Sequence, residues 1–295
     1  MKSAAGTIGR VLAFAGLCLV LSLLLQYAFG GYIARLGDDA IFLSAGFGAV
    51  AATLAGAFLL RTLDHRPAGA LGIAWTGRTV AELGIGMAIG VGAICAAAAL
   101  LAILGFVRYT SDAGTASALL VTLGKDLGIL AVAAYAEEAL FRGYAFQALV
   151  RGFGAVPATI AASGLFALAH AGNPNVGALA LVNIFLAGVL LSVAYLRTES
   201  LWFATAVHLG WNWGLASVLD LPVSGITQLE TPLYEPIVRG PEWITGGAFG
   251  PEAGIVGTLA FGAALAVILV WRQVAPAPEM RALRPLIEDR RQGAE

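Results

Sequence analysis

Two adjacent glutamates and an arginine stand inside an apolar stretch of the sequence, where ionised side chains are rare. Glu137, Glu138 and Arg142 occur in the run AVAAYAEEALFRGYAF. On insertion scales, each such charge would cost about 2.5–3.5 kcal/mol if it faced lipid. Glu138 and Arg142 are four residues apart, so on a helix they share a face and we expect them to pair. Glu137 points about 100° away, and its carboxylate is then free to act as a general base towards water.

Two histidines and an asparagine are the candidate partners of this free carboxylate. His170 ends an apolar segment in the run LFALAH, with Phe166 one turn earlier on the same face. His208 lies in the run WFATAVHLGWNW, with Asn212 one turn later. A single histidine in a membrane helix commonly makes an interhelical hydrogen bond. It is the presence of both histidines in apolar helices, together with the carboxylates, that predicts a catalytic site.

The elements that position these side chains are predicted to be transmembrane helices. Hydrophobic residues make up 59% of the chain and charged residues only 12%, against about 45–50% and about 25% in soluble domains. Apolar segments, which approach the roughly 20 residues that span a bilayer, lie near 11–30, 40–60, 83–105, 118–140, 156–171, 176–196, 200–219 and 254–271. These long, continuous runs differ from the short alternating segments of a membrane barrel. The sequence predicts an all-α, polytopic membrane helix bundle of about eight transmembrane helices, with the site inside the bundle.

Basic residues predict the orientation of the bundle. If the N-terminus is cytoplasmic, only Arg35, Arg108 and Arg239 fall outside and Lys125 falls within a span, which satisfies the positive-inside rule. Arg strongly outnumbers Lys, and Ala and Gly are abundant, as in the proteins of GC-rich bacteria. We therefore expect a multi-pass protein of the bacterial inner (plasma) membrane with both termini in the cytoplasm. The Arg-rich tail after Trp271 is expected to be disordered or to lie on the inner leaflet.

The composition also limits the partners. A net charge of −1 leaves no basic face for nucleic acid. Cys18 and Cys95 both lie in apolar segments, so we expect neither a disulfide nor a cysteine-based metal site. The expected partners are membrane lipid and a peptide or protein substrate, which can itself be lipidated.

Three motifs in this region resemble those of a known family. The run EEALFRG looks like the Glu-Glu-x-x-x-Arg motif of the CPBP intramembrane proteases, which include the CAAX prenyl endopeptidases and the bacterial Abi proteins. FALAH resembles their Phe-x-x-x-His motif, and HLGWN resembles their His-x-x-x-Asn motif. All three occur in the family's order and at similar spacing, each on an apolar helix. The resemblance covers roughly residues 118–217 and implies an eight-helix-like core whose site opens towards the cytoplasmic side.

The resemblance also implies roles for the site residues in an intramembrane endopeptidase. The catalytic residues would be Glu137, His170, His208 and Asn212, and the structural residues of the site would be Glu138, Arg142 and Phe166. Glu137 would activate the attacking water and His170 would help to hold it. His208 and Asn212 would donate hydrogen bonds to the oxyanion of the tetrahedral intermediate, which needs no metal.

A zinc-dependent version of the same hydrolysis is the first alternative. In that version Glu137, His170 and His208 would be ligands that hold a catalytic water on the metal. The chain lacks a His-Glu-x-x-His motif, which excludes only the commonest zinc arrangement. Asn212 is a poor zinc ligand but a suitable oxyanion donor, so we favour the version that requires no cofactor.

Two alternatives belong to other functional classes. A proton-coupled transporter would also place carboxylates and histidines within the membrane, but it would be expected to show inverted repeats or interrupted helices in both halves. A non-catalytic immunity or scaffold protein could keep the fold without turnover. The complete set of motif residues argues against that second alternative.

The chain divides into four predicted regions. Residues 1–110 hold N-terminal transmembrane helices without a motif, and residues 111–219 form the CPBP/Abi-like catalytic core. Residues 220–253 form an outer loop, which is either a lid or a connector. Residues 254–295 contain the last transmembrane helix and a cytoplasmic basic tail.

Overall fold

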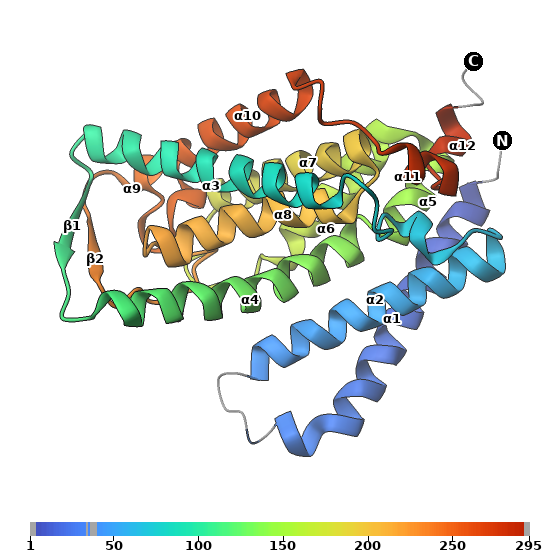
Figure 1. The fold of residues 1–295 in the computed structure, drawn as a ribbon, viewed down its shortest axis with the longest axis horizontal. Coiled ribbons are helices and arrows are strands. Elements are labelled where there is room, and N and C mark those ends of the chain that lie inside the picture. Colours follow the sequence, from blue (N-terminus) through green and yellow to red (C-terminus); the bar gives the residue numbers. More distant parts are fainter. Residues whose placement is uncertain (1–3, 34, 36–39, 292–295) are drawn as a thin grey trace.

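The protein is a bundle of helices, and its computed structural model describes residues 4–33, 35 and 40–291 (Figure 1). The long helices are α1 (Ala4–Ile33), α2 (Ala40–Leu63), α3 (Thr79–Ile103), α4 (Ala116–Phe141), α5 (Tyr144–Phe153), α6 (Ala155–Ala169), α7 (Ala178–Thr198), α8 (Leu201–Trp213) and α10 (Ile255–Val270). The short ones are α9 (Glu242–Thr245), α11 (Pro278–Leu283), α12 (Glu288–Arg291), η2 (Ala68–Leu71), η3 (Gly214–Val218), η4 (Gly247–Phe249) and η5 (Pro251–Ala253). The prediction of an all-α membrane bundle is confirmed.

Each of the eight predicted segments corresponds to a helix, but the helices differ in length. By length and composition, 5 are long and apolar enough to cross a membrane: Ala4–Tyr32, Ser44–Leu63, Thr79–Ile103, Ala116–Phe153 and Ala178–Thr198. Two others, Ala155–Ala169 and Ile255–Val270, are apolar but shorter. The protein is therefore a membrane protein in which long and short helices share the bundle.

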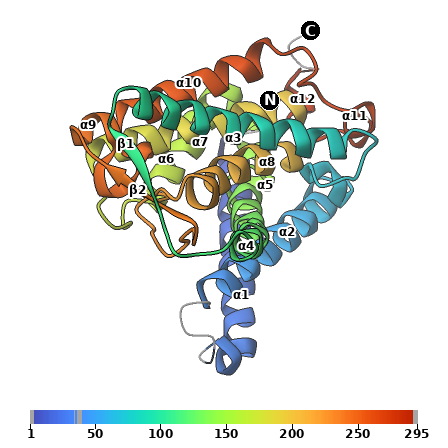
Figure 2. The same ribbon diagram turned by 60° about the vertical axis from the view of Figure 1, so that its left-hand side comes forward.

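The short helix α8 forms the centre of the bundle and lies between α3, α4 and α7 in both views (Figures 1 and 2). It packs most closely against α3, where glycines allow the two backbones to approach. A Cβ atom on Gly210 would lie 2.5 Å from the carbonyl oxygen of Met87, and one on Gly90 would overlap the carbonyl oxygen of Val207. Small residues at such crossings are typical of membrane helix pairs. This close crossing fixes the part of α8 that carries His208.

Two short strands, which the sequence analysis did not predict, join the loop after α3 to the long loop before α10. β1 (Val107–Ser111) pairs antiparallel with β2 (Tyr234–Val238), with Val107 opposite Val238 and Ser111 opposite Tyr234. The hydroxyl of Tyr109 donates to the carbonyl of Leu219 at 3.0 Å. Burial, with Tyr234 and Asp220 nearby, raises the pKa of Tyr109 to about 12. The predicted outer loop is thus fastened to the bundle.

The expectation that the C-terminal tail is disordered is wrong for the residues that the structure describes, while a position on the inner leaflet stays a prediction. Met280, Leu286 and Ile287 are buried, and the backbone N–H of Leu286 donates to the side chain of Gln147 on α5 at 2.8 Å. Arg66 binds Asp289 of α12 at 2.6 Å. The apolar residues between the arginines therefore dock this segment on the bundle. Residues 292–295 of the predicted tail lie outside the described residues.

A buried carboxylate ties the same end of the bundle together. Asp64, which follows α2, accepts hydrogen bonds from Arg151 at 2.7 Å, from Arg10 at 3.3 Å and from the Tyr144 hydroxyl at 2.8 Å. Burial would raise the pKa of Asp64, but the hydrogen bonds from Arg151 and Tyr144 and the two arginine charges outweigh it, so the pKa lies below its ordinary value. Asp64 thus links α1, α2 and α5 in its ionised form.

Replacing Asp64 should give a loss of stability that disappears in acid. Because the folded-state pKa lies below the unfolded value of about 3.9, the ionised carboxylate stabilises the fold fully above that value and loses its effect as the pH falls through the folded-state pKa. Hydrogen bonds to charged groups are worth about 1.5–3 kcal/mol, so Asp64→Asn should destabilise the protein by about that amount at neutral pH. Denaturant unfolding from about pH 7 to about pH 2.5 measures the difference. The exposed Asp112→Asn is the control, and a gap between Asp64→Asn and wild type that persists at the lowest pH would contradict the assignment.

Candidate functional site

The predicted site residues come from the ends of two helices and the middle of a third. Glu137 and Glu138 lie in the last turn of α4, and Arg142 is the residue that ends this helix. His170 ends α6 in the same way. His208 lies on the buried central helix α8. The packing of α4 against α8, and of α6 against α7, which itself packs against α8, brings these side chains together.

Arg142 and Glu138 form the structural base of the site. Their side chains are fully buried and lie 3.1 Å apart, as the spacing of four residues predicts. Arg142 also donates to the carbonyl of Gly188 on α7 at 3.0 Å. Its guanidinium carbon lies 4.5 Å from the ring centre of Phe166. Arg142 therefore fastens α4 to α6 and α7, and its charge offsets that of Glu138.

Glu138 in turn fixes the orientation of His208. The Nδ1 atom of His208 lies 2.9 Å from a carboxylate oxygen of Glu138. An ionised carboxylate can only accept a hydrogen bond, so Nδ1 of His208 carries the proton. The other ring nitrogen, Nε2, lies 3.9 Å from Oε2 of Glu137.

His170 is oriented in the same sense by its own helix. Its Nδ1 atom lies 2.8 Å from the carbonyl oxygen of Phe166, and a carbonyl likewise only accepts, so Nδ1 is again the protonated nitrogen. The Phe166 ring packs against the His170 ring with 4.7 Å between their centres. Nε2 of His170 lies 4.0 Å from Oε2 of Glu137.

One oxygen of Glu137 is therefore the point on which the site converges. In the neutral histidines both Nε2 atoms carry lone pairs and face this oxygen. Oε2 of Glu137 is buried and has no hydrogen-bond partner among the described residues, although the side chain as a whole is 36% exposed. Separations of 3.9–4.0 Å are too long for direct hydrogen bonds but suit a small polar molecule held between the three atoms.

The same three atoms are the predicted zinc ligands, and their chemistry fits that metal. Two unprotonated Nε2 atoms and a carboxylate oxygen are a usual donor set for catalytic zinc. Ligand atoms at about 2.0–2.2 Å around a tetrahedral zinc lie about 3.4 Å from one another, and here the separations are 3.9 and 4.0 Å. Within residues 4–33, 35 and 40–291, no group of three or more His, Cys, Asp or Glu side chains is arranged to hold a metal ion. The donors suit zinc, while their spacing is wider than that of a formed zinc site.

Asn212 lies one turn beyond His208 on α8 and is half-buried. Its amide makes no hydrogen bond within the described part of the chain, and no contact joins it to the cluster around Glu137. The structure thus brings six of the predicted site residues into contact, namely Glu137, Glu138, Arg142, Phe166, His170 and His208. The role of Asn212 as an oxyanion donor stays a prediction.

Glu252 is a residue beside the site that the sequence analysis placed only in the outer loop. Its carboxylate accepts from the Trp211 indole at 2.9 Å and from the backbone N–H and hydroxyl of Ser224 at 2.6 and 2.9 Å. The carbonyl of Ser224 accepts from the Asn173 amide at 2.9 Å, and the backbone N–H of Asn173 binds the carbonyl of His170 at 3.1 Å. Burial raises the pKa of Glu252, and the donors Ser224 and Trp211 oppose that rise. Glu252 therefore connects the turn after His170 to the stretch of α8 between the two predicted oxyanion donors.

Glu252→Gln should lower turnover by about 10–100-fold, the range found when a group that orients a site residue is lost. The amide cannot accept from the indole and from Ser224 as the carboxylate does, so the turn after His170 should loosen. The KM for the substrate should change little, because Glu252 lies behind the site. Steady-state kinetics in detergent measure both constants. Glu242→Gln, at an exposed glutamate of the same loop, is the control, and equal kcat values in the two variants would rule out this positioning role.

Comparison with known protein families gives a match over the part of the chain that holds the site. Residues 119–214 match the family model described as type II CAAX prenyl endopeptidase, Rce1-like. The match covers about a third of the chain and includes every predicted catalytic residue. A comparison with curated proteins found no matching relative.

Proposed function

We propose that the protein is an intramembrane endopeptidase that hydrolyses a peptide bond with a glutamate-activated water, on the basis of the match between residues 119–214 and the Rce1-like type II CAAX prenyl endopeptidase family. The proposal rests on the buried Oε2 of Glu137. This oxygen accepts no hydrogen bond from the described residues, and it lies 3.9 and 4.0 Å from the Nε2 atoms of His208 and His170. A water molecule in this position can donate one hydrogen to Glu137 and the other to a histidine.

Glu137 acts as the base in the proposed first step. It accepts a proton from the water as the water oxygen attacks the carbonyl carbon of the substrate. His170 holds the water through its Nε2 lone pair, which is available because Nδ1 donates to Phe166. Glu137 then returns the proton to the nitrogen of the cleaved bond, which leaves as an amine.

The oxyanion of the intermediate requires donors, and the tautomer of His208 restricts how it can serve. Its Nδ1 is bound to Glu138, so Nε2 can donate only when the ring is doubly protonated. The two neighbouring carboxylates favour that imidazolium form. Asn212 supplies the second donor through its side-chain amide. Glu138 thus contributes indirectly, by stabilising the charge on His208.

The proposed substrate is a peptide or protein segment at the membrane surface, with or without an attached lipid chain. The site lies among apolar helices, so a segment held at the lipid boundary would reach it more readily than a soluble chain. We further propose a location in the bacterial inner membrane with both termini in the cytoplasm, on the basis of the distribution of Arg and Lys.

A zinc-dependent version is the second candidate, and one observation favours it. Nδ1 of His170 lies 2.8 Å from the carbonyl of Phe166 and Nδ1 of His208 lies 2.9 Å from Glu138. In this version both rings would be neutral, and their Nε2 atoms would be free to bind zinc. Glu137, His170 and His208 would hold the metal, and the metal would lower the pKa of the bound water. The wide spacing of the three donor atoms favours the version without metal.

Cleavage of a quenched fluorescent peptide library, with and without a prenyl-like chain, tests the proposal on purified protein in detergent. We expect cleavage that survives treatment with a chelator. Loss of cleavage with chelator and its recovery on addition of zinc would replace the metal-free mechanism by the zinc version. Absence of cleavage across the whole library would count against the peptidase and favour a transporter or a non-catalytic membrane protein.

A further inference from the structure

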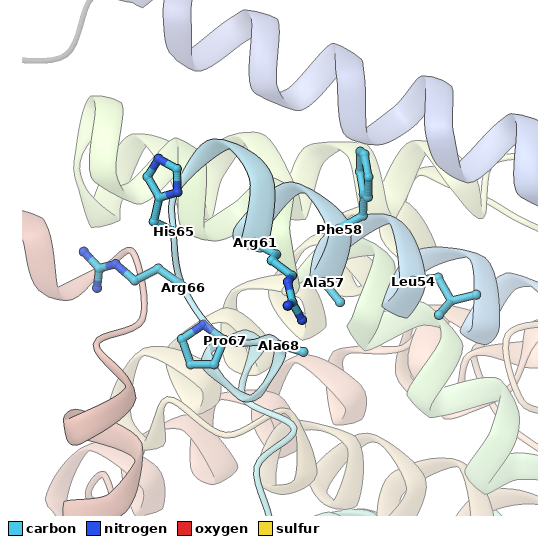
Figure 3. A pocket seen from close by; sticks show the side chains of 8 residues that line it. All are labelled: Leu54, Ala57, Phe58, Arg61, His65, Arg66, Pro67 and Ala68. Atoms are coloured by element: carbon cyan, nitrogen blue, oxygen red, sulfur yellow. The ribbon is translucent and has the colours of Figure 1, made fainter.

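A hollow of about 700 Å³ lies beside the end of α2, and none of the residues that line it belongs to the cluster around Glu137 (Figure 3). Its lining joins an apolar part to a basic part. The apolar part is Leu54, Ala57, Phe58, Pro67 and Ala68, and the basic part is Arg61, His65 and Arg66. We propose that this hollow binds an anionic phospholipid, with the phosphate at Arg61 and an acyl chain along Phe58 and Leu54.

The apolar part follows a face of α2 that the other described helices leave exposed. Leu54 is 54% exposed and Phe58 is 56% exposed, and the two are one turn apart. Leu59 and Leu60 on the opposite side are buried in the bundle. Because Ser44–Leu63 is one of the helices able to cross the membrane, the exposed side chains lie at the depth of lipid tails. The distance from Leu54 to Arg61 along the helix is about 10 Å at 1.5 Å per residue, which lies well within one leaflet.

The basic part lies where the headgroups begin. Arg61 is in the last turn of α2, and Figure 3 shows its side chain extending towards Pro67 and Ala68. Within the described residues its guanidinium has neither an ion pair nor a hydrogen bond. Such a cation beside an apolar surface is complementary to a lipid with a negatively charged phosphate.

The neighbouring charges leave Arg61 free for this role. Asp64 is the acidic residue closest in sequence, but Arg10, Arg151 and Tyr144 already bind it. Arg66 donates to Asp289 and to the carbonyl of Arg284, so its side chain is held in place at the edge of the hollow. His65 is exposed at the same edge of the hollow.

The test compares short-chain lipids on the purified full-length protein. Native mass spectrometry of the protein in detergent measures the binding of dioctanoyl phosphatidylglycerol, dioctanoyl phosphatidylcholine and inorganic phosphate. We expect the anionic phosphatidylglycerol to bind at least about fivefold more tightly than the zwitterionic phosphatidylcholine. One basic side chain near an anionic lipid is worth about 1 kcal/mol, or about a fivefold change in affinity, so Arg61→Gln should remove this preference and Arg61→Lys should retain most of it.

Two further variants separate the site from general attraction to a basic surface. Arg272→Gln removes an exposed charge outside the hollow and should leave the preference intact. Phe58→Ala should weaken the binding of both lipids by about the same factor, because it removes apolar contact and no charge. Thermal unfolding of each variant shows whether it is folded.

Three results would overturn the proposal. The first is equal affinity of the wild-type protein for the two lipids. The second is an equal loss of preference in Arg61→Gln and Arg272→Gln, which would indicate diffuse attraction. The third is equal affinity for inorganic phosphate and for phosphatidylglycerol, which would indicate an anion site without a place for the acyl chain.

Discussion

Glu137→Gln should reduce peptide cleavage by about 10²–10⁴-fold while the protein remains folded. The range is that of a lost general base, because a carboxamide has the shape of the carboxylate but cannot take a proton from water. Folding should be preserved, since Oε2 of Glu137 makes no hydrogen bond among the described residues and its nearest partners are two histidine nitrogens at 3.9 and 4.0 Å. Initial rates on the best library peptide, compared as kcat/KM, measure the effect.

The comparison needs a glutamate whose change should be harmless. Glu230→Gln, at an exposed residue of the long loop, removes the same charge outside the cluster around Glu137 and should cleave like the wild-type protein. Full activity in Glu137→Gln would show that this residue is not the base. A similar loss of activity in both variants would mean that the loss comes from damaged protein and not from the removal of the general base.

The local part of the site could be predicted from the sequence. Two carboxylates and an arginine in an apolar helix must satisfy one another, and the spacing of four residues selects Glu138 as the partner of Arg142. The structure has this pair at 3.1 Å. Helix periodicity alone was sufficient for this step, because the two residues lie one turn apart on the same face at the end of α4.

The meeting of distant residues could not be derived in the same way. Glu138 and His208 are 70 positions apart, and nothing in their spacing determines which face of α8 meets α4. The resemblance to family motifs supplied that grouping. It could not supply Glu252, whose loop has no periodicity and whose contact with Trp211 joins residues 41 positions apart. The strands β1 and β2 could not be predicted either, since each is short and is stabilised by a partner strand far along the chain.

The docking of the C-terminal segment shows a different limit. Its arginines dominate the composition and predicted a tail that is disordered or lies on the inner leaflet. Three apolar side chains, Met280, Leu286 and Ile287, are too few to give a helical pattern, yet all three are buried. Arg66 and Gln147 bind the same segment through hydrogen bonds. Anchoring of this kind depends on the surface that receives the segment, which the segment's own sequence does not contain.

Replacement of Arg142 by methionine should destabilise the protein by about 3–5 kcal/mol, the cost of leaving a buried charge without its partner. Arg142 and Glu138 are both fully buried. Without the guanidinium, Glu138 would face only His208, and the bonds that join α4 to α7 through Gly188 would be lost. Denaturant unfolding of the protein in detergent measures the change. Arg239→Met, at an exposed arginine, is the control.

The double variant Glu138→Gln/Arg142→Met separates charge from packing. It removes both buried charges, so it should be clearly more stable than Arg142→Met alone, as is found when a buried pair is replaced as a unit. Its activity should still be low, because Glu138 no longer stabilises the charged form of His208. A double variant as unstable as Arg142→Met would show that Arg142 acts mainly by packing against Phe166. The variant Glu138→Gln alone should likewise stay folded and lose activity, and full activity in it would overturn the proposed role of Glu138 in stabilising the charged form of His208.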